Sequence, residues 1–327
     1  MKPQYDRVRL VICGGEADTG GLRAALQAFG IENISYCKDT DSMLERMDDG
    51  MVDLLLCHSD EVGESFPKVI QDIRRKSRGR NPFVVVIATV TDTTVSAVKS
   101  LLDGGVDDLI RSPVSSERLL AGIEKFTRQR KSFVASHDYV GPTRRSEKRD
   151  AADPVGLFEA PNSLHCKVIQ NVSDDELQRM VDVAQFELGD RRLEASAVEI
   201  DKLAKLVKKL YTPQDAGEAL IPLLVRLSVL ADDLFLKSNE TAFHQVGNLS
   251  KILSSLVTRI DGKLPNSVTT EVDLLNKLAQ AIRRSVTVER HAVELMQEIV
   301  ETVAGFTNPS EDPGVARSAQ VHAGQRA

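Results

Sequence analysis

The chain has 327 residues, of which 42% are hydrophobic, and this length favours two domains with separate cores. Its 48 acidic residues outweigh 42 basic ones, giving a formal net charge of −6. This balance provides no overall field that would hold a nucleic-acid backbone or an anionic membrane surface. Other proteins are therefore the expected partners.

The four cysteines, Cys13, Cys37, Cys57 and Cys166, lie far apart and form no CxxC pair. This spacing argues against a zinc knuckle, a redox dithiol or a disulfide framework, and it predicts reduced, buried thiols. The N-terminal stretch has too short an apolar run for a signal peptide, and no run of about eighteen apolar residues would span a membrane. We expect a soluble cytoplasmic protein with no cofactor and no metal site.

Between Arg7 and about Arg130, short β-type apolar runs alternate with longer amphipathic segments. This alternation is typical of a parallel sheet covered by helices. The expected strands are Val8–Cys13, Ile34–Cys37, Val52–Cys57, Phe83–Ala88 and Asp107–Ile110. The expected helices are Gly21–Phe29, Thr40–Met47, Pro67–Arg75, Thr94–Leu102 and Ser116–Phe126. The sequence therefore predicts an α/β domain of (βα)5 type over residues 1–130.

The second half of the chain has a different composition. Residues 131–172 are rich in proline, glycine and alternating charge without a sustained apolar period, which predicts a flexible linker. Residues 173–306 carry a helical period, which predicts a separate all-α helical bundle. Its helices are expected to begin at or near Ser173, Glu194, Asp215, Thr241 and Val268. The last is expected to continue through Val303, and residues 307–327 are expected to be disordered.

The segment from Gly104 to Ile123, GGVDDLIRSPVSSERLLAGI, resembles the stretch around the fifth strand of response-regulator receiver domains. The resemblance covers roughly the whole of residues 1–130. It implies a flavodoxin-like fold with a functional crevice at the carboxyl ends of the strands. Receivers place paired carboxylates after strand one, a phosphorylated aspartate after strand three, a hydroxyl after strand four and a Lys–Pro pair after strand five.

At three of these places the chain departs from the receiver pattern. Gly14 and Gly15 stand where the carboxylates would hold Mg²⁺, an ion that requires oxygen ligands. His58 stands at the position of the phosphorylated aspartate, and Ser112 replaces the lysine before Pro113. The resemblance therefore implies a pseudo-receiver that is not phosphorylated on aspartate, because the metal and the fixed cation are missing together.

The switch hydroxyl after strand four is left open by the sequence. Thr89 or Thr91 corresponds to it, or neither does if Val90 takes that place. With Thr89, the residues at the degenerate phosphorylation site are Gly14, Gly15, His58, Thr89 and Ser112.

Two other motifs lie near the expected crevice. Cys13, Cys57 and His58 suggest a metal site because the first and third strands are neighbours. However, Cys57 and His58 are adjacent on one strand and point to opposite faces, so they cannot easily share an ion. The run GGEADTGG from Gly14 to Gly21 resembles a phosphate-binding loop but lacks the lysine and hydroxyl of a Walker motif. We interpret it as a plain strand-to-helix turn.

Arg145 and Arg149, in the expected linker, form an RxxxR pair that resembles the arginine motif with which PilZ domains bind cyclic di-GMP. PilZ domains continue into a D/NxSxxG element and a β-barrel, whereas helices follow here. A solvated basic linker, or a docking point for an acidic partner, is the simpler interpretation.

His244 and His291 are phosphotransfer candidates because a helical bundle is a suitable support for such a residue. Phosphotransfer motifs usually carry a lysine about three residues further on, and here Gly247 and Glu294 occupy those places. Ordinary packed or surface histidines are the favoured interpretation.

The segment from Glu271 to Val300 carries apolar residues at mixed spacings, namely Leu274, Leu278, Ile282, Val286, Val293, Met296 and Ile299. Such a stripe packs within a bundle or against a second copy, and a strict heptad is not sustained. Intramolecular packing is the simpler interpretation, and homodimerisation is the sharper hypothesis.

The sequence thus favours a non-enzymatic adaptor of two-component signalling that binds signalling proteins, such as a kinase or a response regulator. The alternative is histidine phosphotransfer or response-regulator phosphatase activity through the helical domain. A transcriptional role is disfavoured because no basic helix-turn-helix is recognisable, so no nucleic-acid partner is expected.

Overall fold

The computed structural model describes residues 4–14, 19–63, 65–144, 157–212, 219–239, 243–264 and 268–307. The chain divides into two compact units, residues 1–199 and residues 200–327. None of the helices in the described ranges combines the length and the apolar character needed to cross a bilayer.

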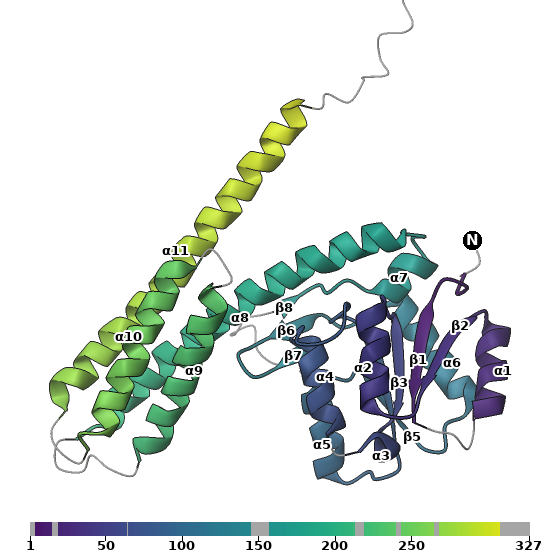
Figure 1. Cartoon of the computed structure of the whole chain (residues 1–327), viewed down its shortest axis with the longest axis horizontal. Coiled ribbons are helices and arrows are strands. Elements are labelled where there is room, and N and C mark those ends of the chain that lie inside the picture. The colour runs from purple at the N-terminus through teal and green to yellow at the C-terminus, as the bar shows by residue number, and fades with distance from the viewer. Residues whose placement is uncertain are drawn as a thin grey trace, which may run out of the picture. The chain divides into compact units, whose positions relative to one another are not determined.

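The first unit contains a five-stranded parallel sheet with strand order β2-β1-β3-β4-β5 (Figure 1). Its strands are β1 (Arg9–Cys13), β2 (Asn33–Cys37), β3 (Leu54–His58), β4 (Val85–Val90) and β5 (Asp108–Arg111). Each overlaps a strand predicted from the sequence, so the predicted flavodoxin-like fold is confirmed. β4 is apolar over most of its length because both faces of the sheet are covered by helices.

Helices cover the two faces of this sheet with separate apolar clusters. The helices of this part are α1 (Thr19–Phe29), α2 (Thr40–Asp49), α4 (Phe66–Arg74), α5 (Val95–Gly104) and α6 (Ser116–Arg128), with a short extra helix α3 (Ser59–Val62). Side chains of α2, α4 and α5 pack on one face and those of α1 and α6 on the other. Alternate residues of β4 therefore enter different clusters, Val86 one and Val85 the other.

The predicted flexible linker over residues 131–172 is wrong for the parts that the structure describes. Strands β6 (Phe133–Ala135), β7 (Val140–Pro142) and β8 (Leu157–Phe158) form an antiparallel sheet in the order β7-β6-β8, and helix α7 (Ser163–Val168) follows. The rings of Phe83, Phe133 and Phe158 meet edge to face at centroid distances of 5.8 to 6.0 Å. These aromatics are too few and too far apart in sequence to produce a period. Arg145 and Arg149 lie outside the described residues.

The predicted domain boundary at residue 173 also differs from the structure. Helix α8 runs from Asp174 to Leu210 without the break expected near Glu194, and the two units divide within it. The predicted start is confirmed, since Ser173 Oγ accepts a hydrogen bond from the Glu176 backbone N–H at 3.2 Å. The first turns of α8 belong to the first unit because their apolar side chains join the cluster of Phe83, Phe133 and Phe158; these side chains are Leu177, Val181, Ala184 and Leu188.

The second unit contains the end of α8 together with α9 (Ile221–Asn239), α10 (His244–Asp261) and α11 (Thr269–Thr307). Helix α10 packs against both α9 and α11. The prediction that the last helix continues through Val303 is confirmed. Of the predicted stripe, Ile282 and Val286 are buried as expected, whereas Leu274 is exposed and its neighbour Leu275 is fully buried. The predicted starts near Asp215 and Thr241 and the predicted tail after Thr307 lie outside the described residues.

Candidate functional site

The carboxyl edge of the parallel sheet brings His58 and Thr89 together. His58 ends β3 and is the register partner of Thr89 in β4. The His58 Nδ1 and Thr89 Oγ1 atoms are 2.9 Å apart, within hydrogen-bond distance, and Thr89 is buried. Ser59 Oγ donates to the Thr89 carbonyl at 2.8 Å, which fixes the two strand ends to each other. Thr91, the other candidate hydroxyl, is tied instead through its backbone N–H to Asp60 Oδ2 at 2.7 Å.

The remaining predicted site residues bring no charge to this edge. Gly14 follows β1 with a φ of 79°, and its N–H donates to the Cys37 carbonyl at 3.0 Å. Gly15 lies outside the described residues. Ser112 follows β5, and its N–H donates to the Val90 carbonyl at 2.8 Å. Among the described residues, no group of three or more His, Cys, Asp or Glu side chains is arranged to hold a metal ion.

Acidic side chains in the loops at this edge are engaged in capping backbone N–H groups. Asp39 is the N-cap of α2 and accepts from the Ser42 N–H at 2.9 Å, and these hydrogen bonds to Ser42 lower the pKa of its carboxyl. Asp92 accepts from the Thr94 N–H at 2.9 Å. Asp60 caps Thr91 in the same way. These carboxylates are occupied by local structure and do not converge on His58.

Three cysteines form a row across the sheet beside this edge. Cys37, Cys13 and Cys57 are register partners on β2, β1 and β3, and they belong to the apolar cluster under α2 and α4. Burial and the hydrogen bond with Cys13 raise the pKa of the Cys57 thiol well above its ordinary value. The Cys57 Sγ lies 3.7 Å from the Met43 sulfur, whereas His58 pairs with Thr89. The predicted interpretation as buried thiols is confirmed for all four cysteines.

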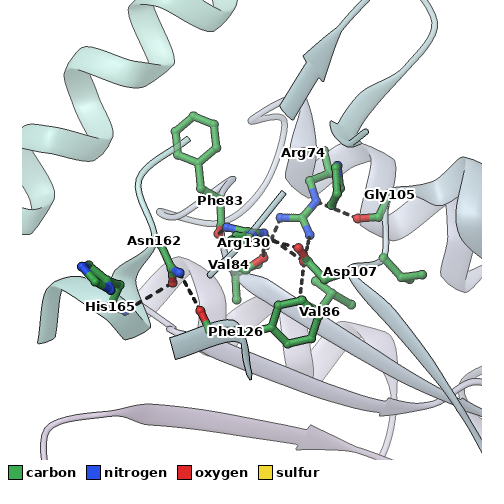
Figure 2. A network of polar contacts seen from close by, with 12 residues as sticks. Arg74, Phe83, Val84, Val86, Gly105, Asp107, Phe126, Arg130, Asn162 and His165 are labelled. Atoms are coloured by element: carbon green, nitrogen blue, oxygen red, sulfur yellow. Dashed lines mark hydrogen bonds and ion pairs between the residues drawn. The ribbon is translucent and has the colours of Figure 1, made fainter. Parts of the chain in front are cut away.

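The opposite, amino edge of the sheet holds a buried network that the sequence reasoning missed (Figure 2). Asp107, directly before β5, accepts from Arg74 Nη2 at 2.9 Å, from Arg130 Nε at 2.8 Å and from the Val86 N–H at 2.9 Å. Both guanidinium groups also donate to backbone carbonyls at the strand starts, including that of Val84. Burial would raise the pKa of the Asp107 carboxyl, but Arg130 and Arg74 outweigh it and hold the pKa below its ordinary value.

A second buried pair lies at the same edge. Lys167 Nζ of α7 is 2.8 Å from Asp53 Oδ2, which also accepts from the Arg9 N–H at 2.8 Å, and Lys167 reaches Asp174 at 3.2 Å. Burial raises the pKa of Asp53 despite the attraction of Lys167. The sequence carries one signal of this pair, because Asp53 directly precedes an apolar strand. Asp is almost never fully buried unless it is paired, so an aspartate at such a position indicates a charged partner. These charges anchor the segment after residue 130 to the sheet.

The two phosphotransfer candidates lie on separate helices of the second unit. His291 is exposed on α11, and His244 is the first residue of α10, with its side chain outside the described residues. Their proposed role stays a prediction.

The strand order 2-1-3-4-5, with His58 and Thr89 paired at the carboxyl ends of neighbouring strands, defines the first unit as an α/β domain of receiver-like fold. The first unit is similar to a signal receiver domain of a two-component histidine kinase from Clostridium thermocellum, with 18% identity over 36% of this chain and 94% of that chain and a TM-score of 0.32. A putative pilus assembly-related protein from Burkholderia pseudomallei matches with 14% identity over 37% of this chain and 90% of that chain, again with a TM-score of 0.32.

A longer match is to the Salmonella typhimurium response regulator RcsB, with 11% identity over 72% of this chain and 92% of that chain and a TM-score of 0.32. No protein-family model and no curated protein matches the chain.

Proposed function

We propose that the chain is a non-enzymatic regulator of two-component signalling, in which the receiver-like unit acts by protein contact and not by aspartate phosphorylation. The observation that carries this proposal is the His58–Thr89 hydrogen bond of 2.9 Å at the carboxyl edge of the sheet. An imidazole stands where an acyl-phosphate acceptor would have to be, and it engages the neighbouring hydroxyl.

The chemistry of phosphoryl transfer also supports the proposal that this unit is not phosphorylated on aspartate. Transfer to a carboxylate needs a metal ion and fixed cations that offset charge on the phosphoryl oxygens. Gly14 offers no oxygen ligand beyond its backbone, and Ser112 offers no positive charge. The buried ion pairs of this unit lie at the amino edge of the sheet, at Asp53 and Asp107, away from the carboxyl ends of the strands.

The partners of such a regulator are signalling proteins, and the helical unit is a candidate for binding them or a second copy. Exposed apolar side chains on several of its helices, among them Val225, Val229 and Leu236 of α9, support a contact role.

Phosphorylation is the direct test. The full chain is incubated with Mg²⁺ and acetyl phosphate beside an intact receiver domain, and the acid-labile phosphate per chain is measured. We expect labelling of the intact receiver only. Stable label on the first unit would contradict the proposal, and label that maps to His244 or His291 would favour the phosphotransfer alternative.

A gain-of-function variant tests the cause of the inactivity. His58→Asp alone is expected to stay unlabelled, because the metal ligands and the cation are still missing. Adding Gly14→Asp, Gly15→Asp and Ser112→Lys is expected to introduce measurable labelling. Equal labelling of the single and the combined variant would show that these positions do not control the chemistry.

A further inference from the structure

Helix α9 has a second apolar face that the second unit leaves uncovered. Its inner face is buried in the bundle through Leu224, Leu227, Leu230 and Leu234. Four further apolar side chains recur at helical spacing on a different side and are between 44% and 65% exposed; they are Ile221, Val225, Val229 and Leu236. We call these four residues the α9 stripe. A helix with two apolar faces usually packs against a partner on both.

Helix α11 is twice as long as α9 and α10. It has 39 residues, against 19 in α9 and 18 in α10. At about 1.5 Å per residue the excess amounts to roughly 30 Å of helix. Figure 1 shows the last, yellow part of α11 running on past α9 and α10. Helices that stand alone are marginal in water, so a long extension implies a packing partner.

The sequence of this extension is amphipathic. Between His291 and Thr307, apolar residues recur at three- and four-residue spacing and share one side of an ideal helix; they are Ala292, Val293, Leu295, Met296, Ile299, Val300, Val303 and Phe306. On the same ideal helix, the sequence positions of Glu294, Glu298 and Glu301 fall on the other side, and the stretch contains no Lys or Arg. The absence of basic residues disfavours an anionic membrane surface as the partner and favours a protein.

We propose that residues 291–307 of α11 pack on the α9 stripe of a second copy of the chain, so that two copies exchange these helices. The inference rests on the contact role proposed above and assigns it a surface. The occupant comes from a second copy because α11 is one continuous helix, which does not turn back onto the α9 of its own chain.

The dimensions fit this arrangement. The α9 stripe spans about 22 Å from Ile221 to Leu236, and residues 291–307 span about 24 Å. Two such helix pairs, each about 10 Å wide, contribute four faces with roughly 1,000 Å² in all. This reaches the area that a specific interface needs.

The test is the solution mass of the full chain by sedimentation or light scattering. We expect twice the chain mass for the wild type. Val225→Glu with Val229→Glu on α9, and separately Val300→Glu with Val303→Glu on α11, are each expected to give monomers with unchanged helix content by circular dichroism. The matched control is Val95→Glu, because Val95 of α5 is 84% exposed in the first unit and is expected to leave the dimer intact.

A cross-linking experiment keeps the proposal testable if a variant fails to fold. One preparation carries Val229→Cys and a second carries Ile299→Cys, and the two are mixed and oxidised. We expect a disulfide-linked pair in the mixture only. A monomeric wild type, or a dimer lost with the α11 variant but kept with the α9 variant, would overturn the proposed contact. Neither result touches the phosphorylation assay, so the two proposals fail separately.

Discussion

A single carboxylate connects three separate segments of the first unit. Asp107, directly before β5, binds Arg74 at the end of α4 and Arg130 just after α6, and all three side chains are almost fully buried. Burying two guanidinium groups with one carboxylate is costly, and the backbone carbonyls that both arginines reach offset part of that cost. Removing the carboxylate would leave two buried positive charges without a counter-charge.

Asp107→Asn is therefore expected to destabilise the first unit by about 3–5 kcal/mol, the usual cost of breaking a buried pair. Urea unfolding of the full chain measures it. Asp48→Asn is the control, since Asp48 pairs with Arg78 on the surface and such exposed pairs contribute less than about 1 kcal/mol. Equal losses in both variants would show that the Asp107 network is not the anchor.

The same carboxyl predicts how stability depends on pH. Because its pKa is held below the ordinary value in the folded chain, Asp107 contributes stability above the unfolded pKa of about 3.9. That contribution is lost as the pH falls through the lowered pKa of the folded state. Asp174, whose pKa is lowered by Lys167 against the effect of burial, acts in the same direction. The raised pKa of Asp53 opposes them, since its contribution weakens as the pH rises.

We expect the urea midpoint to fall on acidification below about pH 4, and the fall to be smaller in Asp107→Asn. Midpoints measured between pH 3 and pH 7 for both proteins check this. An unchanged pH profile in the variant would mean that other carboxyls control acid unfolding.

At the scale of elements, the segment after α6 completes the receiver-like unit. The small sheet of β6, β7 and β8 and the first turns of α8 cover Met51 and Phe83 at the amino edge of the large sheet. Helix α7 supplies Lys167 to Asp53. The five strand–helix repeats therefore do not form a complete domain by themselves. Residues after Arg130 are needed to cover the side chains of Met51 and Phe83 and to pair the carboxylate of Asp53.

Truncation after Arg130 is expected to give an unstable, aggregating fragment, whereas residues 1–199 are expected to fold. The reason is that the shorter fragment exposes Met51 and Phe83 and leaves Asp53 without Lys167. Solubility and cooperative thermal unfolding of the two fragments measure the difference. A stable 1–130 fragment would restore the sequence-based domain boundary.

At the scale of the whole molecule, the two units share helix α8, but the unfolding of each can be followed by a different signal. All four cysteines are buried in the first unit, so their reaction with a thiol reagent follows that unit alone. The dimer contact that we propose involves only the second unit. Mass action stabilises a dimer by about 1.4 kcal/mol for each tenfold rise in concentration.

We therefore expect the helical melting transition of the second unit to rise with protein concentration, while the temperature at which the thiols react stays constant. Circular dichroism and thiol labelling over a hundredfold range of concentration distinguish the two. A thiol transition that also moves with concentration would place the contact in the first unit.

The sequence by itself determined the elements that repeat. Short apolar runs alternating with amphipathic segments over five repeats predicted every strand of the large sheet. Gly14, His58 and Ser112 could be aligned to the carboxyl edge of the sheet because parallel strands end at one edge. Position alone left Thr89 and Thr91 as alternatives, and only the strand register brought Thr89 to His58.

The tertiary structure decided what depends on contacts between distant residues. Strands of two or three residues, such as β6 and β8, are too short to show a period, so the sequence pattern indicated a linker there. The pairs Asp53–Lys167 and Arg74–Asp107 join residues far apart in sequence, and no local pattern links such partners. Burial and charge pairing across the fold, rather than periodicity, extended the first unit into α8.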